Sequence, residues 1–123
     1  MTCCFFGHSI CPLDIRPKIK VQIEKMLTES EKVTFYIGNH GQFDSMVRGI
    51  MKELLSEGKK VNCSVVLAYI PGHKYEFDTP DLYTDTIYPD GLEDAPPKFA
   101  VCKRNDWMID NSDAVICYVV NNF

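Results

Sequence analysis

Strand-length apolar runs alternate with segments of helical periodicity, and this alternation restricts the fold more than any other feature of the sequence. The runs cover residues 2–6, 33–37, 61–70 and 114–120. Runs that are apolar throughout are typical of strands covered on both faces, as in a parallel sheet. Parallel strands joined through helices make right-handed crossovers. The sequence therefore predicts an α/β fold built on a parallel sheet.

The segments between these runs carry helix signals. Asp14 is the expected N-cap of the first helix, which ends near Glu29. In the second helix, apolar side chains from Phe43 onward recur at helical spacing, and Gly58 is a natural C-cap. Gly49 lies inside this helix, which we interpret as a sign of close packing against the sheet.

The region between the third and last runs is the least regular. Residues 75–97 contain seven carboxylates and four aromatic residues but no lysine or arginine. We expect a loop there with one short edge strand around residues 86–88, followed by a helix over residues 98–111. Two interpretations of the acidic loop stay open: a solvated connection, or a lid that places aromatic side chains beside a base.

Length, charge and cysteine usage restrict the class of protein. A chain of 123 residues is long enough for one core, so residues 1–123 are predicted to form a single domain. The net charge of −4 makes binding to duplex nucleic acid unexpected. The N-terminal apolar run is too short for a signal or membrane-spanning segment, which favours a cytoplasmic protein with no membrane partner. The six cysteines form no Cys-x-x-Cys motif and are predicted to be reduced core residues.

Glycine turns with polar side chains follow the first two predicted strands. They are Gly7, His8 and Ser9 after the first strand, and Gly38, Asn39, His40 and Gly41 after the second. Because the carboxyl ends of parallel strands meet at one edge, both turns are expected beside helix N-termini, whose free N–H groups bind anions. Neither turn matches the dinucleotide or P-loop glycine motif. The pair predicts a phosphate site, not a particular ligand.

Two charged side chains could support chemistry at such a site. Cleavage of an N-glycosidic bond needs a carboxylate to stabilise the oxocarbenium-like centre or to activate water. Asp44 is the best-placed carboxylate, and Arg104, with Asn105 beside it, could hold a phosphate bidentately. Structural alternatives stay open for both. Asp44 suits the first turn of a helix whether or not a ligand binds, and Arg104 could be a solvent-facing charge or the ion-pair partner of Asp110 or Asp113.

A metal site is a weaker alternative. His8, His40 and His73 all follow predicted strands, and Cys11 is near the first of them, so a transition-metal site is conceivable. Their spacing matches no known metal-binding signature, and no metal ligand is assigned.

Three segments resemble the YpsA-like family of the SLOG superfamily, a poorly characterised bacterial group. They are residues 2–8, residues 35–38 with 43–44, and residues 104–113, the last being the most specific. The superfamily includes DNA-processing protein A and the Lonely Guy phosphoribohydrolases. The resemblance covers nearly the whole chain. It implies a Rossmann-like three-layer sandwich, with a mainly parallel sheet of four to five strands and about three helices, that binds a nucleotide and requires no cofactor.

The chain departs from the family pattern at the expected ligand site. Ser9 stands where the family usually has arginine, and Asn39 and His40 stand where a glycine or small residue is usual. The sequence stops at Phe123, before the glycine pair and the glutamate on which Lonely Guy catalysis depends. The resemblance therefore favours a nucleotide-binding module or sensor over an enzyme of that type. The last strand is expected to leave one side of the sheet open, which a homodimer could cover.

Two other functions remain alternatives. A hydrolase of the N-glycosidic bond in a nucleotide or nucleotide sugar would use the same pocket. A DNA-processing relative that binds single-stranded nucleic acid would need a local basic strip on the first two helices. Its candidate residues are Lys18, Lys20, Lys25, Lys52, Lys59 and Lys60.

Overall fold

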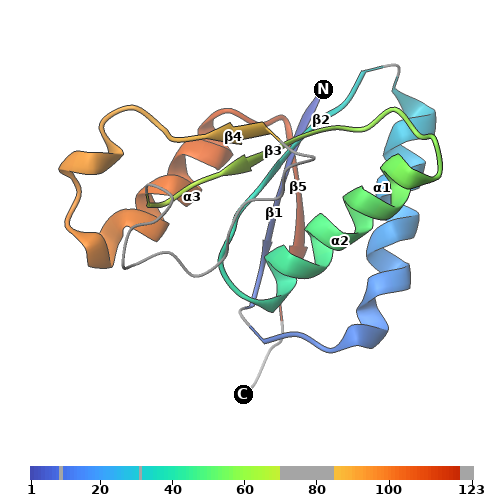
Figure 1. Ribbon diagram of the computed structural model, residues 1–123, viewed down its shortest axis with the longest axis horizontal. Helices are drawn as coiled ribbons and strands as arrows, with labels where there is room; N and C mark the ends of the chain where they lie inside the picture. Colours follow the sequence, from blue (N-terminus) through green and yellow to red (C-terminus); the bar gives the residue numbers. More distant parts are fainter. Residues whose placement is uncertain (9, 31, 70–84, 120–123) are drawn as a thin grey trace.

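A single parallel sheet forms the centre of the molecule. The computed structural model describes residues 1–8, 10–30, 32–69 and 85–119 (Figure 1). The strands are β1 (Thr2–Gly7), β2 (Thr34–Ile37), β3 (Asn62–Val66), β4 (Asp85–Ile87) and β5 (Ala114–Tyr118). They lie in the order β4-β3-β2-β1-β5, and every neighbouring pair is parallel. The prediction of an α/β fold with a mainly parallel sheet of four to five strands is confirmed.

Helices cover the two faces of the sheet unequally. They are α1 (Arg16–Glu29), α2 (Gln42–Ser56) and α3 (Ala100–Asp110). The helices α1 and α2 lie on one side of the sheet, and α3 lies on the other (Figure 1). This is the three-layer Rossmann-like arrangement that the sequence predicts.

The prediction for the start of α1 is wrong, and the prediction for the end of α2 is correct. Asp14 is not the N-cap of α1, because it lies in a short 3-10 turn, Leu13–Ile15, and α1 begins after it without a side-chain cap. Pro17 sits in the first helical turn and has no N–H to satisfy, which lowers the need for a cap. At the end of α2, Gly58 has a φ of +83°, and the backbone N–H of the next residue, Lys59, donates to the Leu54 carbonyl. That is a Schellman ending, as the glycine predicts.

Most of the hydrophobic core lies between the sheet and the α1/α2 layer. Phe5 and Phe35 pack there with their ring centroids 5.7 Å apart, and α2 contributes six buried apolar side chains. A smaller cluster on the opposite face holds Cys4, Val66 and Met108. The layer that α3 forms is therefore the thinner one.

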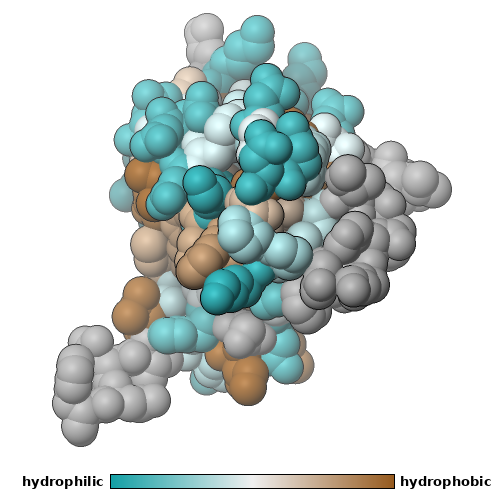
Figure 2. All heavy atoms as spheres, turned by 90° about the vertical axis from the view of Figure 1, so that its left-hand side faces the viewer, coloured by the Kyte–Doolittle hydropathy of each residue, from teal (hydrophilic) through white to brown (hydrophobic). Residues whose placement is uncertain are grey.

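Part of the α3 side of the sheet is left open. Val115 is registered with Cys4, so it faces the α3 side, as does Cys117 along the same strand, and Val119 follows the end of β5. Val115 is 45% exposed and Val119 is 69% exposed. Figure 2 shows hydrophobic side chains gathered on the left flank of that view. A homodimer covering this strip stays a prediction.

Gly49 is not closely packed, contrary to the sequence-based expectation. A Cβ built on it would have no atom within 4 Å, because the glycine lies on the half-exposed outer side of α2. Alanine at this position is therefore expected to raise the free energy of unfolding by about 0.5–1 kcal/mol, through its higher helix propensity. Urea denaturation of the Gly49→Ala variant measures this. A loss of stability would mean that α2 packs against something at this position.

Four of the six free thiols are buried, and two are exposed against expectation. Cys3, Cys4, Cys11 and Cys63 are buried, whereas Cys102 and Cys117 are exposed. Cys102 lies on the outer side of α3, and Cys117 lies on the open strip of β5. Both positions depend on where α3 packs, which the sequence pattern does not specify.

The buried thiols are expected to make the fold sensitive to alkaline pH. Burial raises the pKa of Cys63 from 9.0 to about 12. Between these values the unfolded chain releases a proton that the folded chain keeps, so the free energy of unfolding falls as the pH rises above 9. At pH 10 this thiol alone accounts for about 1 kcal/mol. Between pH 8 and pH 10, the free energy of unfolding from urea denaturation should fall by about 1 kcal/mol less in Cys63→Ala than in the wild type. An equal loss in the two proteins would contradict the assignment.

Candidate functional site

The two glycine turns lie side by side at the carboxyl edge of the sheet. Because β1 and β2 are neighbouring parallel strands, Gly7 and Gly38 end up at the same edge. The sheet order also reverses here: β2, β3 and β4 lie on one side of β1, and β5 lies on the other. In open α/β sheets, ligands bind beyond the carboxyl ends of the strands at such a switch point. The topology therefore points to the same edge as the glycine turns.

An aromatic cluster lines the end of β1. The Phe43 ring lies directly over Gly7, so a Cβ on Gly7 would overlap three of its ring carbons. Tyr118 stacks on Phe43 with centroids 6.4 Å apart and planes at 15°. The exposed His8 ring meets Tyr118 edge-on at 6.0 Å. His8 is thus a wall residue of the site, and Ser9 lies outside the described residues.

Sequence reasoning missed Tyr118. It is registered with Gly7 across the switch point, so it is the last side chain of β5 at the site. The available signal was its place near the end of the final apolar run. That signal needs the strand order, because only a β5 adjacent to β1 brings Tyr118 to this edge.

The turn between β2 and α2 has a defined backbone. Gly41 has a φ of 92°, which favours glycine, and its carbonyl accepts the first helical bond, from Ser45 N–H at 3.2 Å. The His40 backbone N–H donates to Asp44 Oδ2 at 3.0 Å. Asp44, in the first turn of α2, is buried. Its carboxylate therefore holds the turn and is engaged by it.

The segment that follows the first turn is also tied to the start of α2. The Cys11 backbone N–H donates to Gln42 Oε1 at 2.9 Å. A cavity of about 360 Å³ adjoins this contact, lined by Cys11, Leu13, Gln42, Ser45 and Met46. Gln42 is another residue that sequence reasoning missed, since a polar first helical residue is unremarkable by itself.

Arg104 is neither a surface charge nor a partner of Asp110 or Asp113, so both structural alternatives are wrong. It is only 2% exposed because it shares the inward side of α3 with Ala100 and Met108. Asp113 instead accepts the backbone N–H of Thr2 at 2.9 Å.

The guanidinium of Arg104 bonds to β3, to the turn after β2 and to its own neighbour on α3. Its Nη1 donates to the Val66 carbonyl at 3.0 Å and to Asn39 Oδ1 at 3.3 Å, and its Nε donates to Asn105 Oδ1 at 2.8 Å. Burial lowers the pKa of Arg104, and the nearby Asp44 charge opposes that shift. The structure thus brings Arg104, Asn39 and Asp44 together, and Asn105 contacts the site through Arg104.

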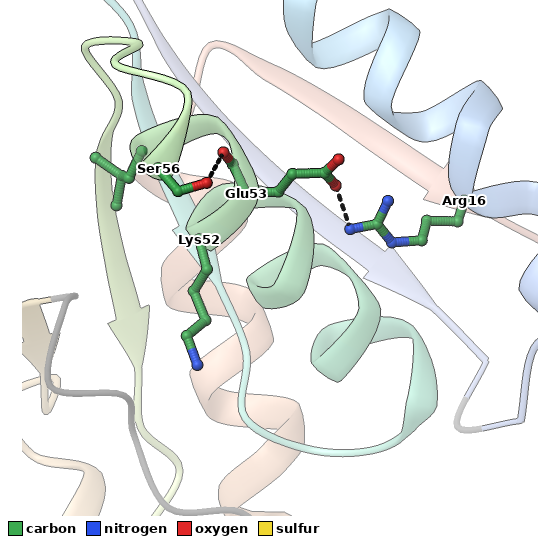
Figure 3. A pocket seen from close by; sticks show the side chains of 5 residues that line it. Arg16, Lys52, Glu53 and Ser56 are labelled. Atoms are coloured by element: carbon green, nitrogen blue, oxygen red, sulfur yellow. Dashed lines mark hydrogen bonds and ion pairs between the residues drawn. The ribbon is translucent and has the colours of Figure 1, made fainter.

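The largest cavity described lies elsewhere. It measures about 670 Å³ and borders the second half of α2, where it is lined by Arg16, Lys52, Glu53, Leu55 and Ser56 (Figure 3). Glu53 forms ion pairs with Arg16 and Lys20, which lower its pKa. At 1.5 Å per residue, this part of α2 is roughly 20 Å from the Gly41 turn. The volume of this cavity alone does not make it the ligand site, because Arg16 in its lining already pairs with Glu53.

The described residues bring no metal site together. In the ranges that the structure describes, no group of three His, Cys, Asp or Glu side chains is arranged to hold an ion. The metal alternative also names His73, which lies outside those ranges.

Comparisons with known proteins add no assignment. No protein-family model and no curated protein matches the chain. The resemblance to the YpsA-like family therefore stays a prediction. None of the helices described is long and apolar enough to cross a membrane.

Proposed function

We propose that the protein binds a nucleotide or nucleotide-derived ligand at the carboxyl edge of the sheet, with the phosphate at the turns that follow β1 and β2. The observation that carries this is the pairing of the two glycine turns beside the N-terminus of α2, at the switch point of the sheet. The first N–H groups of a helix lack partners within the helix, and the helix dipole favours an anion there. Membership of the YpsA-like family and a cytoplasmic location belong to the same proposal.

The geometry favours a binding module over a hydrolase. A carboxylate that activates water or stabilises an oxocarbenium-like centre must reach the substrate. Asp44 is 7% exposed, and its Oδ2 accepts the His40 N–H. That role supports the turn itself, which a binding module and a sensor both require.

A ligand panel tests the proposal. The purified protein is heated with nucleoside monophosphates, nucleotide sugars or inorganic phosphate, and each mixture is then analysed for released base. A ligand at 100 times its Kd should stabilise the fold by about 2.7 kcal/mol, visible as a rise in Tm. Stabilisation without released base supports the binding module, and released base would establish the hydrolase instead. If no member of the panel raises the Tm, the proposed function is wrong.

Two glycines at opposite ends of α2 provide variants to compare. Gly41 and Gly58 have similar positive φ values, 92° and 83°. Alanine at either position brings backbone strain, on the order of 1–3 kcal/mol, and more at Gly41, because its ψ of 175° places it in a region that essentially only glycine occupies. Only Gly41→Ala is expected to weaken ligand binding, by about tenfold or more, because only Gly41 shapes the phosphate turn. Equal affinities in the two variants would place the ligand away from this turn.

A further inference from the structure

We infer that Arg104 is a positioning residue for the Gly38–Gly41 turn, not a contact of the phosphate. It reaches the turn from α3, on the opposite side of the sheet from α2 (Figure 1), and holds Asn39 with the same nitrogen that bonds the Val66 carbonyl. The role in shaping the turn stands on these contacts alone, whereas its consequence for affinity rests on the proposed function.

Gly38 is where the charged groups converge. A Cβ on Gly38 would overlap Asp44 Oδ2 and would lie 3.0 Å from Nη1 and 3.1 Å from Cζ of Arg104. The absence of a side chain at this position is what lets the carboxylate from α2 and the guanidinium from α3 both approach the end of β2. The turn is thus enclosed from both layers of helices.

The presence of the Asp44 carboxylate and the Arg104 guanidinium on either side of Gly38 also has an electrostatic consequence. A phosphate at the N-terminus of α2 would lie near the Asp44 carboxylate, and like charges repel strongly where water is excluded. The Arg104 guanidinium offsets that carboxylate, which leaves the helix N-terminus attractive to an anion. Arg104 therefore supports binding in two ways: it orders the turn, and it neutralises the one acidic group built into it.

Hydrogen exchange of the His40 amide reports on the first role. That N–H bonds Asp44 Oδ2, so its exchange should accelerate about tenfold or more in Arg104→Lys and Arg104→Met. Lysine keeps the charge but loses the planar fork that reaches several acceptors at once. Lys103→Met is the matched control, because Lys103 is exposed on the adjacent position of α3 and should leave the exchange unchanged. Unchanged exchange in folded Arg104 variants would overturn the inference.

Adenosine monophosphate and inorganic phosphate report on the second role. Arg104→Met should weaken their binding about tenfold, and adding Asp44→Asn should restore most of the affinity, since it removes the charge that Arg104 offset. A residue with a merely structural role would give no such rescue. Lost affinity with normal His40 exchange and no rescue would make Arg104 a direct ligand contact and overturn the inference.

Two further arms keep the test decisive. If Arg104→Met does not fold, Arg104→Lys and Asn39→Ala answer the same exchange question, and normal exchange in both contradicts the inference. If the wild type binds neither probe, nor any other member of the ligand panel, the proposed function fails. The exchange measurement then still decides whether Arg104 positions the turn.

Discussion

Replacing Arg104 with methionine is expected to lower the free energy of unfolding by about 3 kcal/mol, among the largest effects of any single substitution in this chain. Arg104 is only 2% exposed, and its Nη1 and Nε donate three hydrogen bonds. Methionine has a similar length but no donor, so the Val66 carbonyl and Asn39 Oδ1 lose a buried partner. The Asp44 carboxylate also loses the charge that opposes it.

Urea denaturation measures this loss, with Lys103→Met as the control that should change stability by less than about 0.5 kcal/mol. Adding Asp44→Asn to Arg104→Met should recover part of the loss, because it removes the buried carboxylate charge that Arg104 no longer opposes. A loss below about 1 kcal/mol in Arg104→Met would mean that the guanidinium is more hydrated than the structure shows.

The sequence predicted the sheet and the meeting of the two turns, because both follow from local pattern. Apolar runs specify strands, and parallel strands necessarily bring the turns after β1 and β2 to one edge. The adjacency of Gly7 and Gly38 needed no knowledge of side-chain packing.

The side chains that complete the site could not be predicted in the same way. Arg104 lies four residues from both Ala100 and Met108, so helical spacing alone places it on an apolar side of α3. Its burial becomes reasonable only once its acceptors, Asn39 and Val66, are known to lie at the ends of β2 and β3. Val66 is 38 residues and Asn39 is 65 residues away from Arg104 in sequence, and only the tertiary fold brings them together.

Gly7→Ala is expected to destabilise the fold by about 2–3 kcal/mol, for a reason that no strand propensity would reveal. Gly7 has no positive φ, so alanine fits its backbone, and the cost is purely steric. The added methyl would overlap the Phe43 ring, which is 1% exposed and stacked on Tyr118. Relief therefore requires a shift of the ring, of the start of α2, or of both.

The same substitution at Gly49 provides the comparison, because a methyl there meets open space and should stabilise the protein. In a Phe43→Leu background, where the flat ring is gone, Gly7→Ala should cost about 1 kcal/mol or less. Because Phe43 also supports Tyr118, and through it His8, displacement of the ring in Gly7→Ala should weaken ligand binding as well as stability. Equal effects of alanine at Gly7 and Gly49 would mean that Phe43 does not cover the end of β1, and the aromatic wall of the site would then have to be placed elsewhere.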